Sequence, residues 1–189
     1  MKKLTPLQTK NLLLKGLRQA WPGVDFVVRI RKSEVLDVSW KNGPSEDAVR
    51  PIVGLFEEGH FDGMDDLYCY HDWSTVYQRD TWPARWRYGH ATRDVSGKEW
   101  VDCEAIYEER HGPILEQQRS QHRFYTELRE IARERAGGIT RQPSPILDAF
   151  SVIPDGVSVS EYFAMEDRDE LDDCVVAFQP ERELSARRL

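Results

Sequence analysis

The chain has 189 residues and a formal net charge of −7 at neutral pH. Its three cysteines, Cys69, Cys103 and Cys174, are too far apart in sequence to indicate a disulfide framework or a CxxC zinc motif. No segment has the pattern of a signal peptide, and none has the run of about 18 apolar residues that a membrane span needs. We therefore expect a protein of a reducing cytoplasm, with no membrane partner.

The first predicted elements are a helix and a β-hairpin. Thr5 to Gln8 has the residue pattern of a capping box with proline at the first helical position, and Pro22-Gly23 ends the helix. Apolar and polar residues alternate from Phe26 to Arg31 and again from Leu36 to Lys41. This period of two is typical of strands with one solvated face, joined by a turn near residues 32–34.

The middle of the chain is predicted to hold three helices and two more strands. In order, these are a helix from Ser45 to about Glu58, strands at 67–70 and 86–92, a helix after a capping box at 96–99, and a long helix from Pro113 to about Ala136. The order α-β-β-α-β-β-α-α predicts an α+β fold with a small, mostly antiparallel sheet and packed helices.

The composition changes near residue 137. Residues 1–137 are expected to form the core domain, with a helical part at 97–137. Residues 138–189 hold four prolines and carry 11 acidic against 5 basic residues. We expect an acidic, proline-punctuated C-terminal segment there, which holds most of the negative charge of the chain.

Residues 25–96 resemble the large-polyvalent-protein-associated domains, which are small modules carried by phages and conjugative elements. Three pieces in order carry the resemblance: Phe26-Val27-Val28-Arg29, then Val38-Ser39-Trp40-Lys41-Asn42-Gly43-Pro44-Ser45-Glu46, then Phe61-Asp62-Gly63-Met64-Asp65-Asp66-Leu67. The resemblance implies a mobile-element origin and action in the cytoplasm of a bacterial host cell. It assigns no catalytic residue.

A cluster of potential ligands lies between residues 60 and 72, but its spacing fits neither an EF-hand loop nor an HExxH helix. Its members are His60, Asp62, Asp65, Asp66, His71 and Asp72. The Asp62-Gly63 pair favours a tight turn leading into the strand at Leu67. No histidine or cysteine has the sequence context of a catalytic nucleophile. We expect no catalytic residue, metal or cofactor; in the enzyme alternative, His60, His71 and Asp62 would carry the activity.

Arginines and aromatic residues interleave between residues 68 and 93, as they do on surfaces that bind single-stranded nucleic acid. Alternating aromatic residues in strands are more often core, and a net negative charge disfavours nucleic-acid binding. If this segment is a surface, it could equally bind protein. Its candidate residues are Arg79, Trp82, Arg85 and Arg87.

An acidic run begins at residue 166. Its candidate partner-binding residues are Glu166, Asp167, Asp169, Glu170, Asp172 and Asp173. Such runs are commonly solvated loops. In the functional interpretation, the carboxylates imitate the phosphates of a nucleic acid and present a comparable field to a basic groove.

The sequence leads to three hypotheses. In the first, the protein inhibits a host defence protein or ribonucleoprotein complex, of CRISPR or restriction type, by acidic occupation of its nucleic-acid-binding surface. In the second, residues 68–93 make it an accessory DNA- or RNA-binding module of a phage or conjugative element. In the third, it is an enzyme. Segregation of acidic and basic residues onto separate faces would favour a binding protein over an enzyme.

Overall fold

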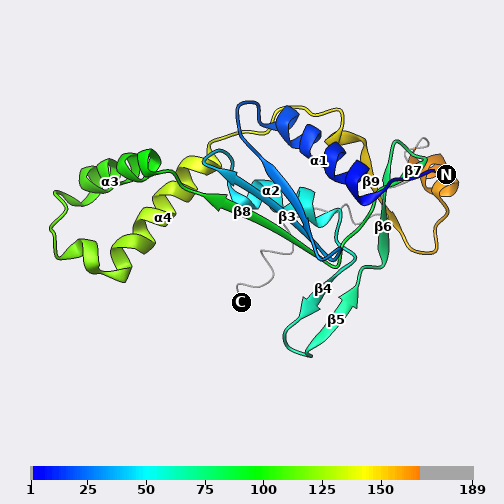
Figure 1. Cartoon of the computed structure of the whole chain (residues 1–189), viewed down its shortest axis with the longest axis horizontal. Coiled ribbons are helices and arrows are strands. Elements are labelled where there is room, and N and C mark those ends of the chain that lie inside the picture. Colours follow the sequence, from blue (N-terminus) through cyan, green and yellow to red (C-terminus); the bar gives the residue numbers. More distant parts are fainter. Residues whose placement is uncertain (1, 167–189) are drawn as a thin grey trace.

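The computed structural model describes residues 2–166 of the chain (Figure 1). Four of the six strand pairings among these residues are antiparallel, which confirms the α+β class. The strands form three small sheets, where a single sheet was expected. Every helix in this part of the chain is too short or too polar to cross a lipid bilayer.

The central sheet has the strand order β2-β3-β8, formed by Val27–Arg31, Val35–Lys41 and Tyr88–Asp94. The predicted β2–β3 hairpin is confirmed, with Lys32 and Ser33 at the positive φ angles of its tight turn. β8 pairs with β3 in parallel, and no strand within residues 2–166 pairs with its other edge.

Two helices cover one face of the central sheet. α1 (Pro6–Ala20) begins at the predicted capping box of Thr5, and Ser45 caps α2 (Glu46–Gly54). The main core lies between these helices and the sheet. It includes Leu13, Leu17, Val28, Leu36, Val38, Trp40, Val49, Val53, Phe56 and Trp86. The opposite face of the sheet is solvated.

A second sheet has the order β1-β7-β6-β9 and combines both ends of the described chain. Its strands are Lys2–Lys3, Thr81–Trp82, Trp73–Tyr77 and Phe150–Pro154. The segment before β9, including the short 3-10 helix η2 (Leu147–Ala149), packs on α1. There, Ser144 donates a hydrogen bond to the Gly16 carbonyl at 3.1 Å. Leu147 thus lies in the main core, and residues 150–154 form one edge of the second sheet.

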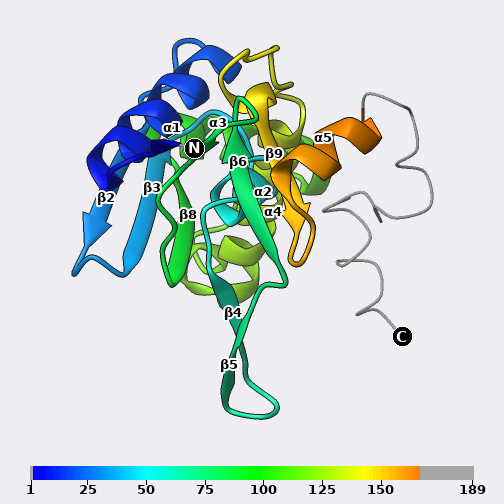
Figure 2. The same cartoon turned by 90° about the vertical axis from the view of Figure 1, so that its right-hand side faces the viewer.

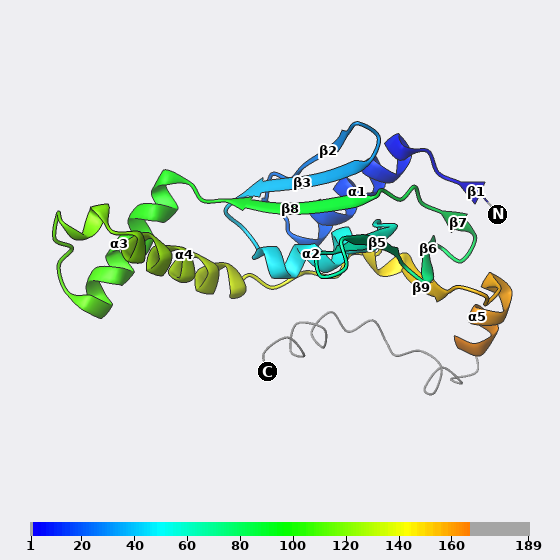
Figure 3. The ribbon, with the colours of Figure 1, turned by 90° about the horizontal axis from the view of Figure 1, so that it is seen from below.

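Residues 97–137, which we call the helical arm, extend from one end of the molecule (Figures 1 and 3). α3 (Gly97–His111) and α4 (His122–Gly137) pack on each other around a separate apolar cluster that includes Cys103 and Leu128. The prediction of one long helix from Pro113 is wrong. A single 3-10 turn, η1 (Gln118–Ser120), precedes α4, because residues 114–121 have no apolar stripe to pack.

The chain beyond the second sheet forms α5 (Val159–Glu166). Tyr162 and Phe163 of this helix join Val76 and Ile153 in a third apolar cluster. The helix therefore packs against the second sheet, close to β6 and β9 (Figure 2).

Candidate binding surface

A two-stranded hairpin projects from the body of the molecule (Figures 1 and 2). It consists of β4 (Gly59–Asp62) and β5 (Leu67–Tyr70), which pair with each other and with no other strand of the described chain. In its turn, the Met64 amide donates to Asp62 Oδ1 at 2.8 Å, and Asp66 has a left-handed φ of 53°. The predicted turn into a strand at Leu67 is confirmed.

The hairpin exposes large apolar side chains. The exposed fractions are 53% for Phe61, 94% for Met64, 61% for Leu67 and 72% for Tyr70. Exposed apolar side chains that occur singly are ordinary, but a contiguous apolar patch is typical of an interaction site. The four residues fall within ten positions on this one projecting element: Phe61 and Tyr70 lie on one face of the hairpin, Leu67 on the other, and Met64 in the turn between them. The exposed apolar side chains are thus concentrated around the end of the hairpin.

The same element is strongly acidic. Residues 57–72 contain six Asp and Glu residues and no Lys or Arg. Within residues 2–166, no Lys or Arg forms an ion pair with Asp62, Asp65 or Asp66. The described residues also include no group of three His, Cys, Asp or Glu side chains placed to hold a metal ion. The carboxylates therefore present an open negative field around the exposed apolar side chains.

Arg85 fastens the base of the hairpin. Its Nε donates to the Glu57 carbonyl at 2.9 Å and its Nη1 to the Trp73 carbonyl at 2.9 Å, so it joins the chain before β4 to the chain after β5. Its guanidinium also lies 4.9 Å from the Trp73 ring centroid, a cation–π distance. Burial lowers the pKa of Arg85 below its ordinary value.

An ion pair between the buried Glu57 and the exposed Arg50 covers the free edge of β8 beside this base. Glu57, which is 8% exposed, accepts a hydrogen bond from the Gly89 amide at 2.7 Å and pairs with Arg50 at 2.9 Å. A Cβ on Gly89 would lie 2.7 Å from Glu57 Oε1, so only glycine allows this approach. The polar side chains replace a neighbouring strand and block edge-to-edge pairing at this point.

A groove of about 380 Å³ separates the hairpin from β8, with Arg50, His60, Phe61, Arg87 and His90 among its lining residues. On the hairpin side, the Tyr68 hydroxyl donates to the Arg87 carbonyl at 2.6 Å. Burial, followed by the charges of Glu58 and Glu57, raises the pKa of Tyr68 to about 12. The phenol is therefore protonated at neutral pH and remains a donor.

The structure places the four Arg and Trp candidates in different surroundings. Arg79 lies over the Phe163 ring at 4.6 Å, and Trp82 packs on the third apolar cluster. Arg85 is committed to the hairpin base, whereas Arg87 lines the groove, 4.9 Å from the Tyr68 ring centroid. Their role in binding stays a prediction. The acidic candidates Asp167 to Asp173 lie outside the described residues, as does the side chain of Glu166.

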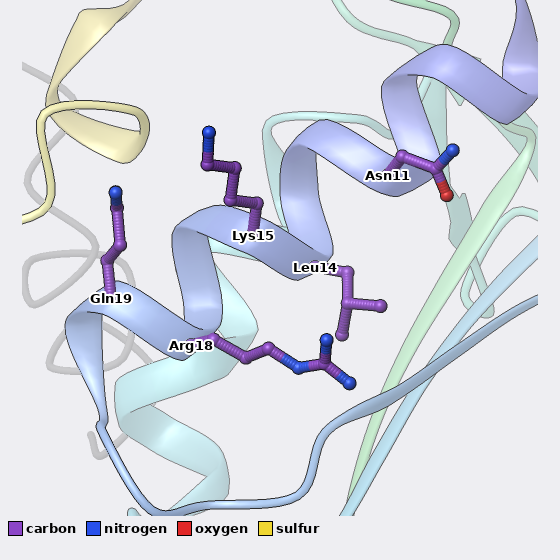
Figure 4. A pocket seen from close by; sticks show the side chains of 5 residues that line it. All are labelled: Asn11, Leu14, Lys15, Arg18 and Gln19. Atoms are coloured by element: carbon purple, nitrogen blue, oxygen red, sulfur yellow. The ribbon is translucent and has the colours of Figure 1, made fainter.

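The charge on α1 is opposite to that of the hairpin. Residues 2–24 contain five Lys and Arg residues and no Asp or Glu. Lys15 and Arg18 line a shallow pocket of about 400 Å³ along the helix, with Asn11, Leu14 and Gln19 (Figure 4). α1 and the hairpin lie on opposite sides of the molecule (Figures 1 and 2).

The metal-ligand spacing considered for residues 60–72 contains no information on this contrast in charge. A count of charges by segment would have revealed both regions.

These elements define an α+β module with a projecting hairpin and an appended helical arm. Residues 4–96, from α1 to the end of β8, match the family model of large polyvalent protein associated domain 29, and this part of the chain belongs to that family. The family associates the protein with phages and other mobile genetic elements.

The match starts earlier than residue 25, where the sequence resemblance was first placed. Leu13 and Leu17 of α1 share the main core with the central sheet, so the helix is part of the same folded unit. No curated protein matches the chain, and no solved structure does.

Proposed function

We propose that this is a non-catalytic counter-defence protein of a mobile element, which binds and inhibits a host nucleic-acid-targeting complex of CRISPR or restriction type. The family domain supports the mobile-element origin. The observation that carries the proposal is the segregation of charge: a basic α1 on one side and a hairpin without Lys or Arg on the other. Such separation is what a binding protein uses to orient on a charged partner.

Electrostatic competition is the proposed mode of inhibition. Duplex DNA carries one negative charge per ~1.7 Å of its axis, held in basic grooves by Lys and Arg. The hairpin brings Asp62, Asp65 and Asp66 together at its tip, and residues 166–173 would add further carboxylates. Together they would occupy a cationic channel and exclude the nucleic acid.

The experiment is an interference assay in a bacterial host that carries a defined CRISPR or restriction system, with binding to the purified effector measured in parallel. We expect the chain to protect phage or plasmid DNA. Neutralising Asp167, Asp169, Asp172 and Asp173 to Asn, together with Asp65 and Asp66, should weaken both protection and affinity. Undiminished inhibition by this variant would end the mimicry proposal.

A second candidate is an accessory nucleic-acid-binding module, favoured by the groove in which Arg87 lies over Tyr68 and Tyr88. A guanidinium beside aromatic rings is a feature of single-strand binding sites. Fluorescence anisotropy of a labelled single strand separates the two candidates. Salt-dependent binding that Arg87→Ala abolishes would favour the module; an absence of binding at low salt would dismiss it.

A further inference from the structure

The β4–β5 hairpin has two chemically different faces, because side chains alternate along each strand. Phe61 pairs across the strands with Tyr68, and the Tyr68 and Tyr70 rings meet edge to face at 5.1 Å. These three aromatic residues share one face. On the other face, Asp62 lies opposite Leu67 and His60 opposite Cys69. The hairpin thus offers an aromatic face together with a mixed acidic and apolar face.

Met64 forms the tip between these faces. At 94% exposure it is the most exposed of the large apolar side chains described here. Methionine is unbranched and polarizable, and it adapts to irregular apolar pockets. The position and the chemistry of Met64 both fit insertion into a partner.

The hairpin is held in a defined position before any partner arrives. Arg85 fixes its two ends, and the Tyr68 hydroxyl ties it to the Arg87 carbonyl. At its base, a Cβ on Gly59 would lie 2.1 Å from the Cys69 carbonyl oxygen, so glycine permits the closest approach of the strands. A preorganised element loses less conformational freedom on binding than a flexible loop does.

Charge identifies the chemistry of the occupant. The carboxylates of Asp62, Asp65 and Asp66 surround the apolar tip and have no basic partner in the described chain. Burying them against an apolar or acidic surface would be unfavourable, whereas Lys and Arg at the rim of a cleft would compensate them. We infer that the hairpin is the docking element of this protein and inserts Met64, Leu67 and Phe61 into an apolar cleft of a partner protein rimmed by lysine and arginine.

This inference rests on the proposed function only for the name of the partner, a host nucleic-acid-targeting complex. The chemistry of the cleft follows from the hairpin alone. A probe independent of the host complex can therefore test it: a short amphipathic helical peptide composed of leucine and lysine, which has the same apolar and cationic character.

The first test measures binding of this peptide to the full chain and to the variant Met64→Ser/Leu67→Ser. The matched control is Leu115→Ser in the helical arm, because Leu115 is 62% exposed and Leu67 is 61% exposed. Loss of two central contacts should weaken binding about tenfold or more, as at interface hot spots. The control should bind as the unaltered chain does. Equal affinities for the two variants, or no binding by the unaltered chain, would overturn the inference.

The second test concerns the rim. Asp65→Asn/Asp66→Asn should lower the peptide affinity at low salt and flatten its salt dependence, because fewer ion pairs remain to be screened. Asp25→Asn, at an exposed position outside the hairpin, is the control and should have no effect. Unchanged thermal unfolding of all variants would show that these exposed substitutions leave the fold intact. If Asp65→Asn/Asp66→Asn leaves the salt dependence of peptide binding unchanged, the proposed cationic rim of the partner is refuted.

The third test separates the docking inference from the proposed function. If the chain inhibits a host effector and Met64→Ser/Leu67→Ser inhibits equally, the hairpin is not the docking element, although the function stands. If the chain inhibits no effector but peptide binding depends on the hairpin, the function fails and the docking surface stands. Self-association that Leu67→Ser abolishes would place a second copy of the chain on the hairpin and overturn the proposed partner.

Discussion

The hairpin and the helical arm both project from the body, yet they differ in how their side chains are packed and how their charges are paired. The arm has an interior of its own, although Val101, Leu115 and Tyr125 are exposed, and it forms several ion pairs. The hairpin encloses no apolar cluster of its own among the described residues, and its carboxylates at Asp62, Asp65 and Asp66 have no basic partner there. The arginine ion pairs that involve the arm are Arg93–Glu99, Arg110–Glu134, Arg119–Glu104, Arg123–Glu127, Arg133–Asp47 and Arg135–Asp102. Projection from the body therefore does not by itself indicate a binding surface. Carboxylates without basic partners, next to exposed apolar side chains, do indicate one.

The sharpest way to break the hairpin side of this comparison is to remove the ion pair beside its base. Glu57→Ala removes the carboxylate that pairs with Arg50 and leaves the Gly89 amide without its acceptor. The loss of this buried acceptor should cost about 3 kcal/mol or more, because a buried donor is left unsatisfied and a charge-assisted bond is lost; chemical denaturation measures the cost. Glu134→Ala removes an exposed pair on the arm and should leave the denaturation midpoint unchanged. Comparable losses for the two variants would contradict the distinction.

The next prediction concerns the stability of the helical arm, which a substitution in its apolar cluster should lower. Leu128→Ala removes a buried side chain, 2% exposed, from the arm cluster and should cost about 2–5 kcal/mol. Because that cluster is separate from the main core, hydrogen exchange should rise across residues 97–137 while β3 and β8 stay protected. Exchange that rises equally in β3 would show that the two cores unfold as one.

The next smaller effect concerns the position of the hairpin. Arg85→Ala leaves the carbonyls of Glu57 and Trp73 without a side-chain donor, which should cost about 1–3 kcal/mol. The loss should also speed hydrogen exchange of the β4 and β5 amides. Arg85→Lys cannot restore both bonds, because an ammonium lacks the planar fork of a guanidinium. Arg29→Ala, at an exposed position of β2 outside the hairpin, is the control and should leave both readouts unchanged.

The smallest expected effect is a difference in reactivity between a cysteine of the hairpin and a cysteine of the helical arm. Cys69 on the hairpin is half-buried, whereas Cys103 in the arm is fully buried and burial raises the pKa of its thiol. A higher pKa leaves less thiolate at a given pH, so Cys103 should react more slowly with iodoacetamide than Cys69. Peptide mass spectrometry reports each site. Faster labelling of Cys103 would mean that the arm opens more readily than its packing indicates.

Local signals could be predicted from the sequence, and contacts between distant segments could not. Thr5, Ser45 and Ser96 each cap the expected helix, because a cap depends on residues three positions apart. β9 was missed because its partner β6 lies far away in sequence, and no short-range pattern encodes that pairing.

The features of the candidate site also separate into local ones, which can be predicted from the sequence, and long-range ones, which cannot. The acidic composition of residues 57–72 can be counted in the sequence. The role of Arg85 cannot, since it depends on the carbonyls of Glu57 and Trp73 being brought together by the fold. Among the interleaved arginines, the half-buried Arg85 holds the base of the hairpin and the exposed Arg87 lines the groove, and their role in binding a partner stays a prediction.

The return of the chain after the helical arm has a consequence for how the protein can vary. Gln142 rejoins the body by donating to the Ala20 carbonyl at 2.8 Å, and β9 then pairs with β6. The arm is therefore an excursion between two parts of one scaffold, with its own interior. Recombination could therefore replace residues 97–137 by another segment, while the central sheet and the second sheet kept their packing.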